Sequence, residues 1–250
     1  MKRAAFALLL AFSLFLFYEI NYEVPILMYH RVGDASDKSG LSVSTGTFER
    51  QMEFLKVHHT RVMSLEDLTG HIRLEQGIPW NTVVITFDDG TGDNFQNAFP
   101  VLKKMGFPAT IFMITRNIGK EGWLTEEDLK ILDTSGISVG SHTASHAFLP
   151  DLKKEESLLE LRESRNCLEK ILMHPVFLFS YPAGGVTKEA KALVAKEGYH
   201  GAVTTNYGTK RHDLYALHRV KITEAKGNLF NFWIKTSGLY QVGKKRITIA

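Results

Sequence analysis

Short apolar runs alternate with longer amphipathic stretches over most of the chain. The apolar runs predict seven β-strands, at residues 24–29, 82–87, 109–114, 137–141, 176–180, 201–203 and 217–222. The amphipathic stretches predict helices at residues 47–58, 94–105, 125–134, 153–173 and 188–197. Each predicted strand is followed by a loop or a helix, which is typical of βα units built around a parallel sheet.

This alternation predicts a single α/β domain. The segment 33–46 is polar and is expected to form one surface loop, and no repeat or Pro/Gly-rich linker interrupts the chain. Strands in this number suit either a closed barrel or an open doubly wound sheet. The periodicity by itself leaves both architectures open.

The first residues form a separate segment. Lys2 and Arg3 precede an almost unbroken apolar run over residues 4–17, the charged-then-apolar order of an export signal. We therefore divide the chain into an N-terminal signal peptide or signal anchor at residues 1–21 and a domain at residues 22–250. We favour an uncleaved anchor, with the two basic residues on the cytoplasmic side, because no small-x-small cleavage site follows the run. A cleaved signal peptide is the alternative, so the domain is expected at the extracellular face of the cell membrane or secreted.

Composition narrows the functional classes. The formal net charge is +3 and the basic residues are scattered, so the sequence lacks the basic patch with which proteins bind nucleic acid. The single cysteine, Cys167, lies among leucines at helical spacing, and one cysteine excludes an intramolecular disulfide. We therefore expect no nucleic-acid partner.

The predicted strand 82–87 ends in two adjacent carboxylates, Asp88 and Asp89, followed by Gly90. Adjacent residues that leave a strand point in different directions, so one carboxylate can bind a metal ion while the other stays free as a base beside it. A polar turn in which an aspartate caps the next helix is the structural alternative.

Two histidines follow the predicted strand 137–141. His142 and His146 are four residues apart, a spacing that brings both imidazoles to one face of a helical turn, where they can bind one cation. With Asp89 they supply three protein ligands, which leaves a coordination position open for water, as in catalytic zinc sites. Because such a histidine pair also arises by chance in a chain with ten histidines, it is the combination with the two aspartates that indicates a metal site.

The predicted strand 176–180 ends in Tyr181, Pro182, Ala183 and two glycines. Proline and glycine hold the backbone in an irregular turn, and such turns can direct backbone N–H groups at a developing oxyanion. A turn without function is the alternative.

Taken in this order, the motifs resemble those of the polysaccharide deacetylases, carbohydrate esterase family 4. The sequences Thr-Phe-Asp-Asp-Gly at 86–90, Ser-His-Thr-Ala-Ser-His at 141–146 and Tyr-Pro-Ala-Gly at 181–184 carry the resemblance, which extends over residues 24–222. The opening Pro-Ile-Leu-Met-Tyr-His at 25–30 is similar to the branch that acts on poly-N-acetylglucosamine. The resemblance implies a single-domain distorted (β/α)7 TIM-like barrel with the motifs at the C-terminal ends of its strands.

The resemblance also implies roles for these residues. Asp88 is then the catalytic base, and Asp89, His142 and His146 bind a divalent metal, usually zinc and sometimes cobalt or nickel. Asp88 takes a proton from a metal-activated water that attacks the acetamide carbonyl, and the backbone N–H of Ala183 stabilises the oxyanion. The substrate is then an N-acetylated extracellular polysaccharide: poly-N-acetylglucosamine, a chitin-like polymer or peptidoglycan.

The chain departs from the family in two places. The family often has an arginine two residues before the turn proline, where this chain has Ser180, and an aromatic residue after it, where this chain has Ala183. That arginine orients the base, so Asp88 is expected to find another partner. The family also carries Leu-x-His-Asp near the C-terminus, whose histidine is a general acid, and here His218 is the candidate. In a strand His218 and Arg219 face opposite sides, so only one of them can enter the site.

Three further residues are candidates for substrate binding. His30 follows the first predicted strand and is expected to open into a barrel site, with a core histidine as the alternative. Tyr181 and Trp123 are candidates for stacking on sugar rings, although single aromatic residues more often belong to the core.

A C-terminal apolar cluster, formed by Phe230, Phe232 and Trp233, lies outside these motifs. We expect it to pack on the barrel, with contact to a membrane or a glycan as the alternative.

Two other functions stay open. The motifs specify the reaction before the substrate, so the chain could hydrolyse a different amide or an O-acetyl ester. It could also be a glycan-binding pseudoenzyme, which the absent arginine favours. Retention of Asp88 beside three metal ligands argues against a pseudoenzyme, because a binding protein has no need of a base there.

Overall fold

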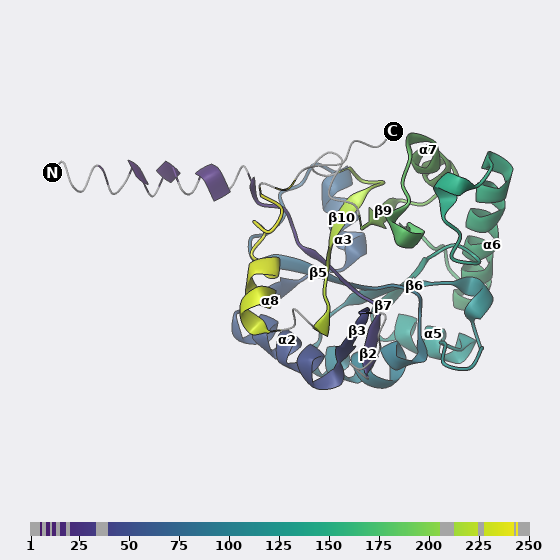
Figure 1. Cartoon of the computed structure of the whole chain (residues 1–250), viewed down its shortest axis with the longest axis horizontal. Helices are drawn as coiled ribbons and strands as arrows, with labels where there is room; N and C mark the ends of the chain where they lie inside the picture. Colours follow the sequence, from purple (N-terminus) through teal and green to yellow (C-terminus); the bar gives the residue numbers. More distant parts are fainter. Residues whose placement is uncertain are drawn as a thin grey trace.

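Seven parallel strands close into a barrel in the order β1, β10, β9, β8, β7, β6, β5 and back to β1, with helices around it (Figure 1). The structure is a computed structural model that describes residues 21–33, 40–205, 213–224, 228–242 and 244, with some positions between 6 and 18. The barrel strands are β1 (Ile26–Tyr29), β5 (Thr82–Phe87), β6 (Ala109–Met113), β7 (Ile137–Ser141), β8 (Leu178–Ser180), β9 (Gly201–Thr204) and β10 (Leu217–Lys221). All seven predicted strands are confirmed, and the pairing of β1 with β5 closes the barrel.

Five of the helices follow the predicted positions: α2 (Thr45–Val57), α4 (Phe99–Met105), α5 (Glu126–Thr134), α6 (Lys154–Leu172) and α7 (Lys188–Lys196). A π-helical turn at Asn94–Ala98 precedes α4. Two helices were not predicted, α3 (Leu65–Arg73) and α8 (Leu229–Thr236). Both are amphipathic but short, at nine and eight residues, so each periodic pattern covers little more than two turns.

The prediction of one surface loop at residues 33–46 was wrong at both ends. β2 (Arg31–Gly33) and β3 (Ser42–Ser44) pair in parallel, and α2 begins at Thr45. A further short strand, β4 (Arg61–Val62), pairs with the start of β5. Strands of two or three residues are too short to give an alternating pattern in the sequence.

The barrel interior changes from apolar to polar towards the C-terminal ends of its strands. Its apolar end contains Val84, Leu178 and Leu217 in one buried cluster. Two residues farther along β8 and β10, the same faces carry Ser180 and Arg219, because side chains on one face of a strand recur every second residue. The polar end of the barrel therefore forms where the sequence motifs were found.

Most of the predicted N-terminal segment 1–21 lies outside the described residues, so its division from the domain at 22–250 stays a prediction. Within the part of the chain that the structure describes, no helix combines the length and the apolar character needed to cross a membrane.

Candidate active site

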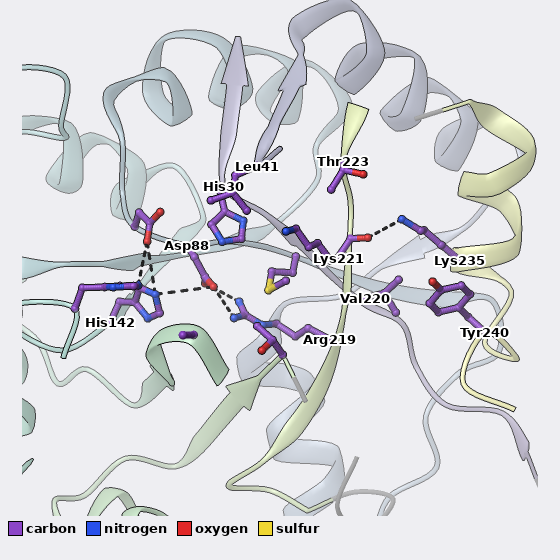
Figure 2. A pocket seen from close by; sticks show the side chains of 15 residues that line it. His30, Leu41, Asp88, His142, Arg219, Val220, Lys221, Thr223, Lys235 and Tyr240 are labelled. Carbon is purple, nitrogen blue, oxygen red and sulfur yellow. Dashed lines mark hydrogen bonds and ion pairs between the residues drawn. The ribbon is translucent and has the colours of Figure 1, made fainter. Parts of the chain in front are cut away.

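A buried ion pair between Asp88 and Arg219 lies at the polar end of the barrel (Figure 2). Asp88 follows β5 and Arg219 lies on β10. Both residues are buried, with 2% of their surface exposed. Arg219 Nη1 donates to Asp88 Oδ1 at 2.6 Å, and Nη2 donates to Oδ2 at 2.5 Å. The guanidinium also donates to Ser180 Oγ at 2.9 Å and to Thr86 Oγ1 at 3.2 Å. Arg219 is therefore the partner that Asp88 was expected to find.

The ion pair fixes the charge of Asp88. Burial alone would raise the pKa of this carboxyl, but the positive charge of Arg219 and its hydrogen bonds to the carboxylate outweigh burial and hold the pKa well below its usual range. Asp88 is thus ionised at neutral pH. Ser180 Oγ also donates to Oδ1 at 3.3 Å, so Oδ2 is the oxygen that can still accept a proton or a hydrogen bond after the contact with Arg219.

His218 points away from this site. Its Nδ1 lies 2.9 Å from Gln241 Nε2, and its side chain contributes to a separate small cavity with Gly238 and Tyr240. The prediction of His218 as the general acid was therefore wrong. The alternation along β10 that directs Arg219 into the barrel turns His218 outwards.

Asp89, His142 and His146 converge on one point of the cavity wall. One ligand atom from each lies within 4.8 Å of the others, and Asp89 Oδ1 is 3.7 Å from the Nε2 atoms of both histidines. His142 Nδ1 lies 2.8 Å from the Ser180 carbonyl oxygen, which can only accept, so Nδ1 carries the proton and the Nε2 lone pair faces Asp89. Burial lowers the pKa of His142, which favours the neutral form that metals bind. Two imidazole nitrogens and one carboxylate oxygen fit a divalent cation such as zinc.

The loop that carries both histidines is not the predicted helical turn. Thr143 and His146 have φ values of 62° and 64°, in the left-handed region. Glu160 of α6 is buried and accepts hydrogen bonds from the backbone N–H groups of residues 144–145, both at 2.9 Å. Arg116 Nη1 lies 3.7 Å from the same carboxylate. Glu160 therefore holds the loop in shape, a role that no local sequence pattern indicated.

Ala183 lies at the rim of the cavity in a turn with φ 50°. The hydrogen bonds of this turn come from the N–H groups of Tyr181, Gly184 and Gly185. The N–H of Ala183 takes part in none of them, so it is available to an acceptor in the cavity.

His30 contributes to the cavity, which has a volume of about 590 Å³ (Figure 2). Burial is the main cause that lowers the pKa of His30 to about 4, and the nearby charges of Arg219 and Lys221 act in the same direction, so the ring is neutral at pH 7. Its Nδ1 atom is buried without a hydrogen-bond partner among the described residues. Sequence reasoning missed Lys221 and Lys235, which also line the cavity.

The two aromatic candidates for substrate binding lie outside this cavity. Tyr181 is completely buried, its hydroxyl donates to the Tyr215 carbonyl oxygen at 3.0 Å, and its ring packs on Phe179. Trp123 packs against the main hydrophobic core, and its backbone pairs with Thr91. The structure therefore places neither ring in this cavity: Tyr181 belongs to the core, and the stacking role of the partly buried Trp123 stays a prediction.

Comparison with known proteins agrees with this geometry. A family model described as polysaccharide deacetylase matches residues 77–202. The chain is 35% identical to the protein YxkH of Bacillus subtilis (strain 168) over 86% of this chain and 77% of that one. It is 26% identical to the poly-beta-1,6-N-acetyl-D-glucosamine N-deacetylase of Staphylococcus aureus (strain MRSA252) over 79% of this chain and 78% of that one.

The fold agrees with a solved deacetylase structure as well. The Streptococcus pyogenes deacetylase PplD, solved in complex with acetate, superposes with a TM-score of 0.80 at 26% identity, over 86% of this chain and 98% of PplD. The TIM-like barrel that the resemblance implied is therefore confirmed. The match to the family model, the identity to YxkH and the shared barrel together place the chain in the polysaccharide deacetylase family, whose members are hydrolases.

Proposed function

We propose that this protein is a metal-dependent N-deacetylase that hydrolyses the N-acetyl groups of amino sugars in an extracellular polysaccharide. One observation carries the proposal: the ionised carboxylate of Asp88 lies 4.0 Å from His142 Nε2, beside the converging groups of Asp89 and His146. The Staphylococcus aureus relative is named for poly-beta-1,6-N-acetyl-D-glucosamine, so we propose this polymer as the first substrate to test.

Different residues of the cavity contribute to different steps of the reaction. Asp89, His142 and His146 would hold a divalent metal, most readily zinc, which would supply Lewis acidity for the attacking water and for the acetamide carbonyl. Asp88 accepts the proton of the attacking water, while Arg219 keeps the plane of its carboxylate fixed.

Other groups act on the substrate. The N–H of Ala183 donates to the carbonyl oxygen as that oxygen gains negative charge, an interaction whose loss typically costs about 10²–10³ in rate. His30, with an unused buried nitrogen on the cavity wall, contacts the sugar. His218 faces away, whereas His30 and Lys221 are titratable side chains that line the same cavity as Asp88, where the amine leaves.

A pseudoenzyme is the weaker proposal. It was favoured by the missing family arginine beside the turn proline. Arg219 supplies a bidentate partner to Asp88 from a different strand, so that argument is lost.

We also propose that the N-terminal segment anchors the enzyme at the outer face of the cell membrane. Lys2 and Arg3 ahead of the apolar run support this location. The exposure of the run supports it too, because the side chains of Phe6, Phe12 and Phe17 are about half exposed or more. A soluble enzyme has little use for such a run of uncovered apolar side chains.

The first test is acetate release from poly-N-acetylglucosamine, chitooligosaccharide and peptidoglycan by the zinc-loaded enzyme, after chelation, and after zinc is restored. We expect zinc-dependent release.

Asp88→Asn should lower kcat by about 10²–10⁴ with zinc still bound, because it removes a general base, whereas His142→Ala should lose zinc itself. Glu163→Gln, on α6 and outside the cavity lining, is the control. Release that survives chelation, or no release from any substrate by a folded zinc-loaded enzyme, would show the proposal to be wrong.

Arg219 is expected to set the pH range of the reaction. Its positive charge lowers the pKa of Asp88, so Arg219→Met should raise that pKa and move the acid limb of the kcat/KM profile to higher pH. Arg219→Lys keeps the charge but loses the bidentate geometry, and it should shift the limb less while still lowering kcat. The pH–rate profiles of both variants measure this, and two profiles that coincide with the wild type would exclude the role.

Glu160 is expected to govern metal affinity. Because its carboxylate holds the loop between His142 and His146, Glu160→Gln should weaken zinc binding by about 10–100-fold, as loss of groups that orient metal ligands commonly does. Glu163→Gln is a matched control, since Glu163 also pairs with Arg116 but does not contact the loop. Zinc competition with a chromophoric chelator measures both, and equal affinities in the two variants would contradict the assignment.

A further inference from the structure

A band of apolar side chains, half-buried at Tyr18 and exposed beyond it, begins where the N-terminal segment joins the barrel. The ring of Tyr18 lies 5.3 Å from the ring of Trp80, and the Tyr18 hydroxyl lies 3.5 Å from the carbonyl oxygen of Ser237, just after α8. Trp80, in the segment before β5, is 52% exposed. The N-terminal segment thus reaches the domain between an exposed tryptophan and the end of α8.

The helix α8 continues this band. Its inner face is buried, since Phe232 has no exposed surface and packs edge-to-face on Phe54 of α2 at 5.8 Å. On its outer face Phe230 is 67% exposed and Trp233 is 53% exposed, with ring centroids 5.9 Å apart. The C-terminal cluster therefore packs on the barrel through Phe232, as predicted, and presents its other two rings to the surroundings.

The two parts of the band meet at one cavity. A hollow of about 580 Å³ lies between the N-terminal segment and α8, and its lining includes Tyr18, Tyr22 and Trp233. We call the set Tyr18, Trp80, Phe230 and Trp233 the apolar band. In Figure 1 the described residues of the N-terminal segment lie on the side of the barrel where α8 lies.

A lipid surface fits this band better than another protein or a sugar. Single exposed apolar residues are ordinary, but these residues continue an N-terminal run whose described apolar side chains are also uncovered. Tryptophan and tyrosine concentrate at the boundary between lipid and water, where the ring is apolar and one edge is polar. A helix with phenylalanine, tryptophan and leucine on its outer face is typical of helices that lie in that boundary.

We propose that the apolar band docks the barrel on the outer leaflet of the bilayer that the N-terminal segment enters. The proposal rests on the membrane anchor of the proposed function and adds a defined orientation to it. The same helix reaches the active site, because Lys235 of α8 lines the catalytic cavity and donates to the Lys221 carbonyl oxygen at 2.6 Å. Docking through α8 therefore holds the cavity at a fixed position relative to the membrane, where it meets polymers close to the cell surface.

The three tryptophans of the chain allow a direct test, since Trp80 and Trp233 belong to the band and Trp123 packs on the core. Full-length protein is reconstituted into vesicles of phosphatidylglycerol and phosphatidylethanolamine, with and without a bromine-labelled phosphatidylcholine that quenches tryptophan at shallow depth. Each variant keeps one tryptophan and carries phenylalanine at the other two. We expect bromine-dependent loss of fluorescence for Trp80 and Trp233 and none for Trp123.

A second variant and a second measurement separate docking from anchoring. Phe230→Asp should reduce the quenching of Trp233 while acetate release from a soluble chitooligosaccharide stays at the wild-type rate. Alkaline carbonate extraction reports on the anchor alone. Protein that resists extraction but shows no quenching of Trp80 and Trp233, or equal quenching of Trp123, would overturn the docking surface and leave the anchor intact. Quenching that persists in protein released by carbonate would keep the docking surface and overturn the anchor.

Discussion

The buried ion pair between Asp88 and Arg219 is the constraint on which the rest of the site depends. Two charges out of water are stable only if each is paired and hydrogen-bonded, and loss of one partner leaves an uncompensated buried charge that costs about 3–5 kcal/mol. The interior of the barrel is built to meet this condition. Thr86 and Ser180 accept hydrogen bonds from Nη1 and Nη2 of the guanidinium, and the ring of Phe112 lies beneath Arg219, with 5.6 Å between the guanidinium carbon and the ring centroid.

The packing below the ion pair follows from this arrangement. Gly140 of β7 leaves room for the ring of Phe112, since a Cβ atom there would approach the ring to 2.6 Å. The ring in turn supports the guanidinium that holds Asp88. The loop of His142 and His146 begins two residues after this glycine, and Glu160 fixes the loop from the outside of the barrel. The base and the metal-binding groups are thus held by separate contacts to one rigid wall.

Much of this arrangement was predictable from local sequence patterns. The seven barrel strands are short apolar runs, and the aspartate pair and the histidine pair stand at strand ends, where a parallel barrel brings them together. Strand alternation predicted that only one of the neighbours His218 and Arg219 enters the site. Choosing Arg219 required the structure, because its partner Asp88 lies 131 residues away in the chain. The same alternation that turns Ser180 inwards turns Tyr181 outwards into the core, so the error at Tyr181 was avoidable. Glu160 lacks a sequence signal, because its function depends on how α6 packs against a loop.

Crystals of the zinc-soaked protein, measured on both sides of the zinc absorption edge, test the central claim most directly. The account predicts one anomalous peak at about 2.0–2.2 Å from Asp89, His142 and His146, with Asp88 outside the ligand set and still paired with Arg219. A peak bound by Asp88 in place of Asp89, or a zinc-saturated protein without a peak at these residues, would contradict it.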